Sequence, residues 1–275
     1  MIGKDNSTLM VKKYKKPNWQ WVQIGERDML LFKTILEQKS LRRTEVIEHI
    51  FEGKDFYAEL RLRKLKRFGY LNAVRLWFRE PESYLLGEAG VEVLRENGCC
   101  IGNLGFPIVA GRTFPSPQTK IEPAAYEHDI KVTQVRFLFE RLRFCQDWHS
   151  EKLLRMGTTG ERKVPDGFFT NNGKGIAVEV EISPKKAETY RKIFRVYDKD
   201  QKITDIFYIC GDDAIFQKIK NLSFGATLKN YWFVLYGNLM RFKAHTILRS
   251  HGKNSPLKGL LEGSSDRTVN QTVTE

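Results

Sequence analysis

The sequence predicts an α/β chain (α+β overall) in which a basic helical part precedes a part built around a mixed sheet. In the first part, up to about residue 100, apolar side chains recur every three or four positions, the period of amphipathic helices. Over residues 124–245, short apolar and aromatic runs alternate with helical patterns, which is typical of a sheet flanked by helices. Residues 101–123 are rich in Gly and Pro and predict a linker between two domains.

The composition favours a nucleic-acid-binding protein of the cytoplasm. The chain has 275 residues, and an apolar fraction of 41% is enough for packed cores. Its net charge of +13 favours a polyanionic partner, with nucleic acid ahead of an anionic membrane surface. No run approaches the roughly 20 apolar residues of a membrane span, and the first residues lack the apolar core of a signal peptide. The four cysteines have no metal-ligand spacing and suit a reducing compartment.

The first part has the element order of a winged helix-turn-helix. Its predicted elements are helices over residues 26–38, 41–51 and 56–68, extended segments over 71–78 and 83–86, and a helix over 88–96. The two extended segments flank an Arg-Glu-Pro-Glu turn, as expected for the wing. We therefore predict a winged helix over residues 23–100, preceded by a basic, flexible arm over residues 1–22.

Positive charge is concentrated in this part of the chain. Residues 1–80 contain 18 Lys and Arg against 10 Asp and Glu, a net charge of +8. Basic side chains on the third helix of such a domain contact phosphates and reach base edges in the major groove. The alternatives are a winged helix that serves dimerisation or the docking of another protein. The predicted DNA-binding residues are Arg42, Arg43, Arg61, Arg63, Lys64 and Arg67.

The second part is organised around a predicted hairpin over residues 164–183, with an Asn-Asn-Gly-Lys-Gly turn. The side-chain period of two places Glu179 and Glu181 on one face of the second strand, about 7 Å apart, and Asp166 on the first strand offers a third carboxylate. Like charges at this distance repel unless a cation lies between them, and Mg²⁺ or Mn²⁺ prefers such oxygen ligands. The alternative is a strand whose two glutamates face solvent.

The other elements of the second part follow from the same patterns. They are one long helix or two abutting helices over residues 125–156, a helix over 184–196, a strand over 205–210, a helix over 212–222 and a strand over 231–236. The periodic pattern ends near residue 244, so we expect residues 246–275 to form a mobile polar tail.

The sequence lacks the motifs of several catalytic classes. No Gly-x-x-x-x-Gly-Lys-Ser/Thr segment occurs, which excludes a P-loop ATPase or helicase. The histidines form no His-x-His, which the common relaxase and rolling-circle nickase site requires, and no His-Glu-x-x-His. A Gly-x-Ser-x-Gly elbow is also absent. The remaining candidates for catalytic residues are acidic side chains.

The acidic residues resemble the metal site of the PD-(D/E)xK nuclease superfamily. Pro165-Asp166 matches the "PD", Glu179 matches the second acid after a hairpin, and Glu151 lies on a preceding helix. The resemblance implies a restriction-endonuclease-like domain over residues 124–245, with a central mixed sheet flanked by helices. It also implies one or two divalent ions, which polarise the scissile phosphate and lower the pKa of an attacking water.

One position departs from that superfamily. The usual lysine two residues after the second acid is replaced by Glu181. Either Glu181 is a further metal ligand, or the positive charge comes from Lys185 or Lys186 on the next helix.

The wider order of motifs resembles the replication-relaxation family, which includes the MobC-type relaxases of mobilisable plasmids. The resemblance covers roughly residues 25–240 and rests on the winged helix, His128-Asp129, Trp148-His149-Ser150-Glu151, the acidic hairpin, and Lys186, Tyr190 and Tyr197. It implies a bacterial or plasmid-borne protein that nicks or relaxes a transfer or replication origin, together with other mobilisation or replication proteins. Trp148 is expected in the core. The two tyrosines are either a packing stripe or include a covalent nucleophile.

We therefore predict a sequence-specific DNA-binding protein with metal-dependent, relaxase-like nicking at a plasmid or mobile-element origin. Its expected cofactor is Mg²⁺ or Mn²⁺, and its partners are double-stranded DNA and a second copy of the chain. The first alternative is a non-catalytic DNA-binding regulator or replication accessory protein with a degenerate nuclease-like domain. The second is a basic protein that docks to a partner such as a coupling ATPase. The predicted catalytic residues are Glu151, Asp166, Glu179, Glu181 and Lys186, with Glu151, Asp166 and Glu179 as metal ligands.

Overall fold

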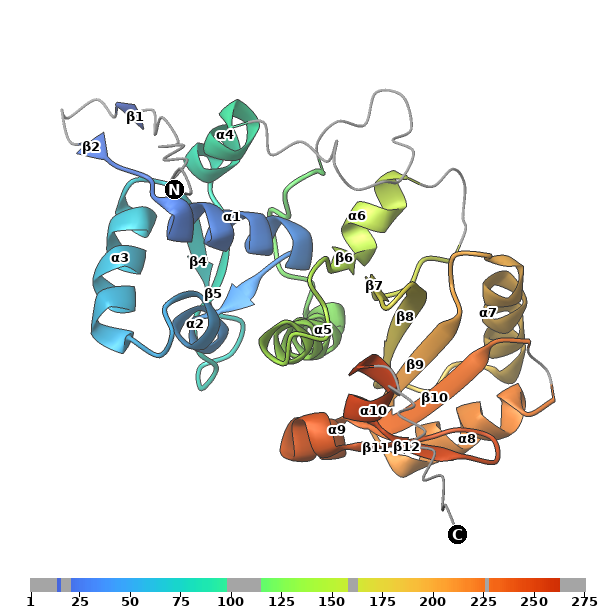
Figure 1. Cartoon of the computed structure of the whole chain (residues 1–275). Coiled ribbons are helices and arrows are strands. Elements are labelled where there is room, and N and C mark those ends of the chain that lie inside the picture. Colours follow the sequence, from blue (N-terminus) through green and yellow to red (C-terminus); the bar gives the residue numbers. More distant parts are fainter. Residues whose placement is uncertain (1–13, 16–20, 98–114, 158–162, 226–227, 263–275) are drawn as a thin grey trace, which may run out of the picture. The chain divides into compact units, whose positions relative to one another are not determined.

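The computed structural model describes residues 14–15, 21–97, 115–157, 163–225 and 228–262 (Figure 1). The chain forms two compact units, one of residues 1–133 with 155–159 and one of residues 134–154 with 160–275. The boundary between them therefore falls inside a helix, α5 (Pro123–Arg141), and not in the linker expected over residues 101–123. Most of that linker and of the expected basic arm lie outside the described residues.

The first unit contains short helices around a small antiparallel sheet with strand order β3-β5-β4. Its elements are β1 (Tyr14–Lys15), β2 (Trp21–Val22), α1 (Glu26–Gln38), β3 (Leu41–Arg42), α2 (Arg43–Glu45), η1 (Val46–Ile50), α3 (Asp55–Arg67), β4 (Leu71–Val74), β5 (Ser83–Leu86) and α4 (Glu88–Glu96). The helix expected over residues 41–51 instead starts as a strand, because Leu41 pairs with Tyr84 of β5. It then continues as a short α-helical turn and a π-helical turn.

Two glycines allow α4 to lie close to the end of α3. A Cβ on Gly87 would come within 2.2 Å of the Gly69 carbonyl oxygen, and one on Gly90 within 2.5 Å of the Tyr70 carbonyl oxygen. Both approaches are to backbone atoms, so neither position has room for a side chain. Tyr70, which takes part in this close approach, is buried in the core. Its ring stacks on Phe32 with centroids 5.9 Å apart.

The second unit is a mixed sheet flanked by helices, as expected. Within the described residues, the strand order of this sheet is β12-β11-β10-β9-β8-β7-β6. The strands β8, β9 and β10 run parallel to one another. After α5, the elements are β6 (His149–Ser150), α6 (Glu151–Met156), β7 (Gly167–Asn171), β8 (Lys174–Glu181), α7 (Ala187–Lys199), β9 (Asp205–Cys210), α8 (Asp213–Ser223), β10 (Asn230–Leu235), α9 (Tyr236–Phe242), η2 (Lys243–His245), β11 (Ile247–Arg249), β12 (Asn254–Pro256) and α10 (Leu257–Glu262). Figure 1 shows the parallel strands side by side, with α7 and α8 beside them.

Two expectations for this unit are corrected. The helical pattern over residues 125–156 is broken after α5, where Arg143 takes a positive φ of 58° and the chain turns towards β6. Residues 247–262 are not a mobile tail, because β11 pairs with β10 and the side chains of Leu248 and Leu257 are buried. Strands of three residues carry too little pattern to be recognised in the sequence. Residues 263–275 lie outside the described part of the chain.

The hairpin of β7 and β8 lies inside the sheet, and two glycines let its neighbours approach. A Cβ on Gly167 would lie 1.9 Å from the ring of Trp148, which packs face to face with Phe169. A Cβ on Gly175 would lie 1.7 Å from the backbone oxygen of Lys202. Trp148 is therefore a core residue, as expected, and β8 is covered on both faces. No helix in the described part of the chain is long and apolar enough to cross a membrane.

Candidate functional site

The hairpin brings three of the predicted acidic residues into the interior. Asp166 directly precedes β7, and its carboxylate accepts a hydrogen bond of 2.8 Å from the backbone N–H of Val180, which lies between Glu179 and Glu181. Asp166 is 8% exposed, Glu179 3% and Glu181 4%. A strand with two solvent-facing glutamates is therefore not what the chain forms. Seven of the eight residues of β8 are buried, so both of its faces are covered, and strands pair with it on both edges.

Glu179 has both carboxylate oxygens engaged. Lys163 lies 2.9 Å from one oxygen, and the hydroxyl of Tyr197 on α7 donates a hydrogen bond to the other. Burial raises the pKa of Glu179 to about 7, and the charge of Asp166 adds to this rise, whereas Lys163 and Tyr197 oppose it. The carboxyl group therefore changes its charge near neutral pH.

Lys163 is the cation that the three acids share. Burial lowers the pKa of Lys163, but attraction to Glu179, then to Asp166, and more weakly to Glu151 outweighs burial, so the pKa is raised. The ammonium thus stays charged among carboxylates from β8, from the start of β7 and from α6. We define these four residues, Glu151, Lys163, Asp166 and Glu179, as the acid–lysine cluster.

Glu151 is held beside this cluster by the backbone. It is the first residue of α6, and its N–H donates to the backbone oxygen of Asp166 at 3.2 Å. Glu151 and Asp166 are therefore joined through the backbone, and both act on the charge of Lys163, whereas only Glu179 forms an ion pair with it.

Glu181 and the two lysines of the following turn are arranged differently. Glu181 forms its own ion pair with Lys185, whose backbone N–H donates to the hydroxyl oxygen of Tyr190 at 3.1 Å. Lys186 is exposed just before α7, and no ion pair joins it to the acids within the described residues. Neither predicted lysine therefore belongs to the acid–lysine cluster. The lysine of the cluster is Lys163, three residues before Asp166. It precedes the hairpin and belongs to no recognisable sequence motif.

The two candidate tyrosines are core residues. Tyr190 and Tyr197 both lie on the helix α7, and their side chains are buried, with 0% and 1% exposed. Burial, and then the charge of Glu179, raise the pKa of Tyr197 well above its ordinary value. Both rings are buried and an ionised Tyr197 hydroxyl is disfavoured, so the packing stripe is the interpretation that the structure supports.

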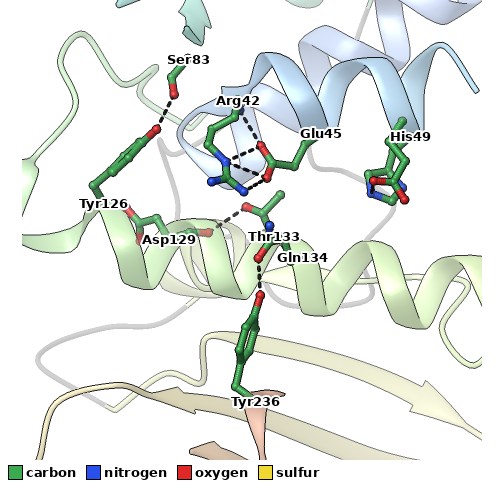
Figure 2. Close-up of polar contacts among 10 residues, drawn as sticks. Arg42, Glu45, His49, Ser83, Tyr126, Asp129, Thr133, Gln134 and Tyr236 are labelled. Atoms are coloured by element: carbon green, nitrogen blue, oxygen red, sulfur yellow. Dashed lines mark hydrogen bonds and ion pairs between the residues drawn. The ribbon is translucent and has the colours of Figure 1, made fainter. Parts of the chain in front are cut away.

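The predicted DNA-binding residues of the first unit divide into two groups. Arg42 forms an ion pair with the buried Glu45 (Figure 2). Arg61 binds the buried Asp28 and the backbone oxygen of Gln23. These guanidinium groups hold the fold together, because breaking them would leave a buried carboxylate unpaired.

The remaining predicted contacts lie on the outer face of α3 or beside it. Arg43 is held by Asp55 at 2.7 Å and by Glu59 at 3.3 Å. The exposed group on α3 is Arg63, Lys64 and Arg67, of which Arg63 lies 3.6 Å from Glu59. These three side chains are the part of the predicted set that a phosphate backbone can reach.

Two further findings bear on function. Within the described residues, no three His, Cys, Asp or Glu side chains are arranged closely enough to hold a metal ion as they stand. Comparison of the chain with protein-family models, with curated proteins and with solved structures gave no match.

We expect Lys163→Met to destabilise the protein in a pH-dependent way. The raised pKa of Glu179 means that folding favours proton uptake, so stability falls as pH rises from about 4.5 to about 7. Removing Lys163 raises that pKa further. The variant should therefore lose about 3–5 kcal/mol of unfolding free energy at pH 8, and less at pH 5.5. Urea denaturation at both pH values measures it.

Lys185→Met is the matched control, because Lys185 also pairs with a buried glutamate of β8 but is 42% exposed. Lys185→Met should lower the free energy of unfolding by less than Lys163→Met does, because the Lys185 side chain is partly solvated. Equal, pH-independent losses in the two variants would contradict the account of the acid–lysine cluster.

Proposed function

We propose that this protein binds double-stranded DNA through its first unit and nicks a phosphodiester bond with the acid–lysine cluster of its second unit. The observation that carries the proposal is the burial of Asp166 and Glu179 around Lys163. Removing charged groups from water costs several kcal/mol per ion, and a hydrophobic replacement would often be more stable. Such a group of perturbed charges is a candidate for chemistry and not for stability.

The first unit supports DNA binding by its element order and its charge. We interpret the sequence of α1, α2 with η1, and α3, followed by β4, β5 and α4, as a winged helix-turn-helix. In this fold the third helix enters the major groove. Arg63, Lys64 and Arg67 lie on the exposed side of α3, where they can neutralise phosphates and release counterions.

The second unit supports a restriction-endonuclease-like active site. The acids come from a hairpin inside a mixed sheet and from the helix α6, in the order of the PD-(D/E)xK pattern. We infer that Lys163 takes the part of the lysine that this pattern has two residues after the second acid. The proposal includes membership in the replication-relaxation family, and therefore an origin-type DNA substrate on a plasmid or other mobile element.

The cluster fits Mg²⁺ or Mn²⁺ by its donor chemistry. Glu151, Asp166 and Glu179 offer only carboxylate oxygens, which these ions prefer, and the charges of all three raise the pKa of Lys163. A bound divalent ion would polarise the scissile phosphate and lower the pKa of an attacking water. Because both oxygens of Glu179 are engaged, Lys163 must first release its contact with this carboxylate.

The chain's own residues then have separate roles. Tyr197 donates to Glu179 from α7 and fixes the orientation of that carboxylate. The Val180 N–H fixes Asp166 in the same way. Once released from Glu179, the Lys163 ammonium would pair with a phosphate oxygen bound beside the acids and stabilise the negative charge that develops on it.

The same contacts favour a second candidate, a DNA-binding regulator or replication accessory protein without catalysis. Lys163 already neutralises Glu179, and the described acids do not form a ready three-ligand group. In that case the ammonium replaces the metal ion permanently, and the second unit has a structural role.

Nicking of supercoiled DNA distinguishes the two candidates. With plasmid DNA carrying the sequence that flanks the protein's own gene, Mg²⁺ or Mn²⁺ should convert supercoiled to open-circular DNA, and EDTA should prevent this. Asp166→Asn and Glu179→Gln should lower the rate by about 100-fold or more, since each removes a charge at the reacting phosphate.

Glu181→Gln is the control for the nicking assay, because Glu181 lies on the same strand but pairs separately with Lys185. It should retain activity within about tenfold. Tight DNA binding without nicking under any of these metal conditions would support the non-catalytic candidate.

DNA binding through α3 predicts a specific salt dependence. Arg63→Ala, Lys64→Ala and Arg67→Ala should each weaken duplex binding and reduce the slope of log affinity against log salt concentration by about 1. Fluorescence anisotropy at several salt concentrations measures both quantities. Arg95→Ala is the control, since Arg95 is 57% exposed on α4 of the same unit. If Arg95→Ala weakened binding as much as the α3 variants, the effect would be one of net charge and not of α3.

A further inference from the structure

The loop between β4 and β5 ends in a tight turn that projects one aromatic side chain. The backbone N–H of Glu80 donates to the carbonyl oxygen of Trp77 at 3.1 Å, which closes a four-residue turn. Phe78 and Arg79 are its two central residues. Phe78 is 90% exposed, whereas the neighbouring Trp77 is 51% exposed.

The base of this turn is anchored in the first unit. Leu76 packs against the apolar cluster of Leu85, Ile121 and Tyr126, and the ring of Trp77 lies 5.5 Å from the ring of Tyr126. The hydroxyl groups of Tyr126 and Ser83 of β5 are hydrogen-bonded at 2.9 Å, as Figure 2 shows. The contacts of Leu76 and Trp77 thus fix the base of the turn to the first unit, whereas the Phe78 side chain is exposed to solvent.

The surroundings of Phe78 are positively charged. Arg75 and Arg79 flank it in the loop, both are exposed, and neither forms an ion pair within the described part of the chain. Of the two acids nearby, Glu82 is paired with Lys66 at 3.0 Å, with a weaker attraction to Arg75, and Glu80 is half-buried. An exposed aromatic ring between two available guanidinium groups matches a partner that is anionic and also offers a flat apolar face.

A nucleobase next to its own phosphates has these properties. In intact duplex the faces of the bases are covered by stacking, so a ring such as Phe78 can use them only where a base is unpaired or a step is opened. We propose that Phe78 stacks on an unpaired base, with Arg75 and Arg79 on the adjoining phosphates, so that the protein prefers duplex with a locally opened segment. This inference rests on the proposed DNA binding and names the form of DNA that is bound.

The test compares a fully paired duplex with the same duplex containing a short unpaired segment, by fluorescence anisotropy. Wild-type protein should bind the opened DNA more tightly than the paired DNA. Phe78→Ala should weaken binding to the opened DNA by roughly 5- to 150-fold, the range expected for loss of one base–aromatic stack. Binding to the paired duplex should be unchanged. Phe78→Trp should retain the preference, because its ring also stacks.

The outcomes separate this inference from the proposed function. If wild-type protein binds both DNAs and Phe78→Ala leaves their ratio unchanged, the stacking inference is overturned while DNA binding stands. If wild-type protein binds neither DNA, the proposed function fails and the inference fails with it. If Phe78→Ala instead disrupts a dimer seen by analytical ultracentrifugation and changes no DNA affinity, the turn is a protein contact. Because Phe78 is exposed, the variants should keep the wild-type melting temperature.

Discussion

The second unit depends on the contact between Lys163 and Glu179. The glutamate lies on the strand β8, which has a parallel neighbour on one side and an antiparallel neighbour on the other, and it is only 3% exposed. A carboxylate in that place requires a cation, a proton or both, and burial raises its pKa although Lys163 opposes the rise. Lys163, Tyr197 and the Val180 N–H together make the buried charge tolerable.

The same contact links the fold to the proposed chemistry. The backbone pairing of β7 with β8 fixes Asp166 beside Glu179, and the glycine at position 167 lets Trp148 cover the start of the hairpin. The side chains that approach the acids are therefore set by strand register and not by a flexible loop. A site built in this way keeps its carboxylates oriented before any ligand arrives, which favours electrostatic catalysis.

Much of the fold could be predicted because long periodic segments carry a clear signal. The ranges of α1, β5, α4 and β9 coincide with those expected, and the mixed sheet flanked by helices is confirmed. The position of Glu179 and Glu181 on the same strand could be predicted as well, since strand alternation places both side chains on one face. Their burial could not, because it depends on strands that pair from distant parts of the sequence. The place of Lys163 is unpredictable for the same reason, and so is the ion pair of Arg61, because its partner Asp28 lies on another helix.

The central claim is that the acid–lysine cluster is a divalent-cation site, and Mn²⁺ binding tests it without requiring turnover or DNA. Electron paramagnetic resonance of free Mn²⁺, titrated with protein at pH 8, reports the number of bound ions. We expect binding that is abolished in Asp166→Asn and in Glu179→Gln and retained in Glu181→Gln, because Glu181 belongs to a separate ion pair. Absence of binding in the wild type, or equal binding in all four proteins, would contradict the claim.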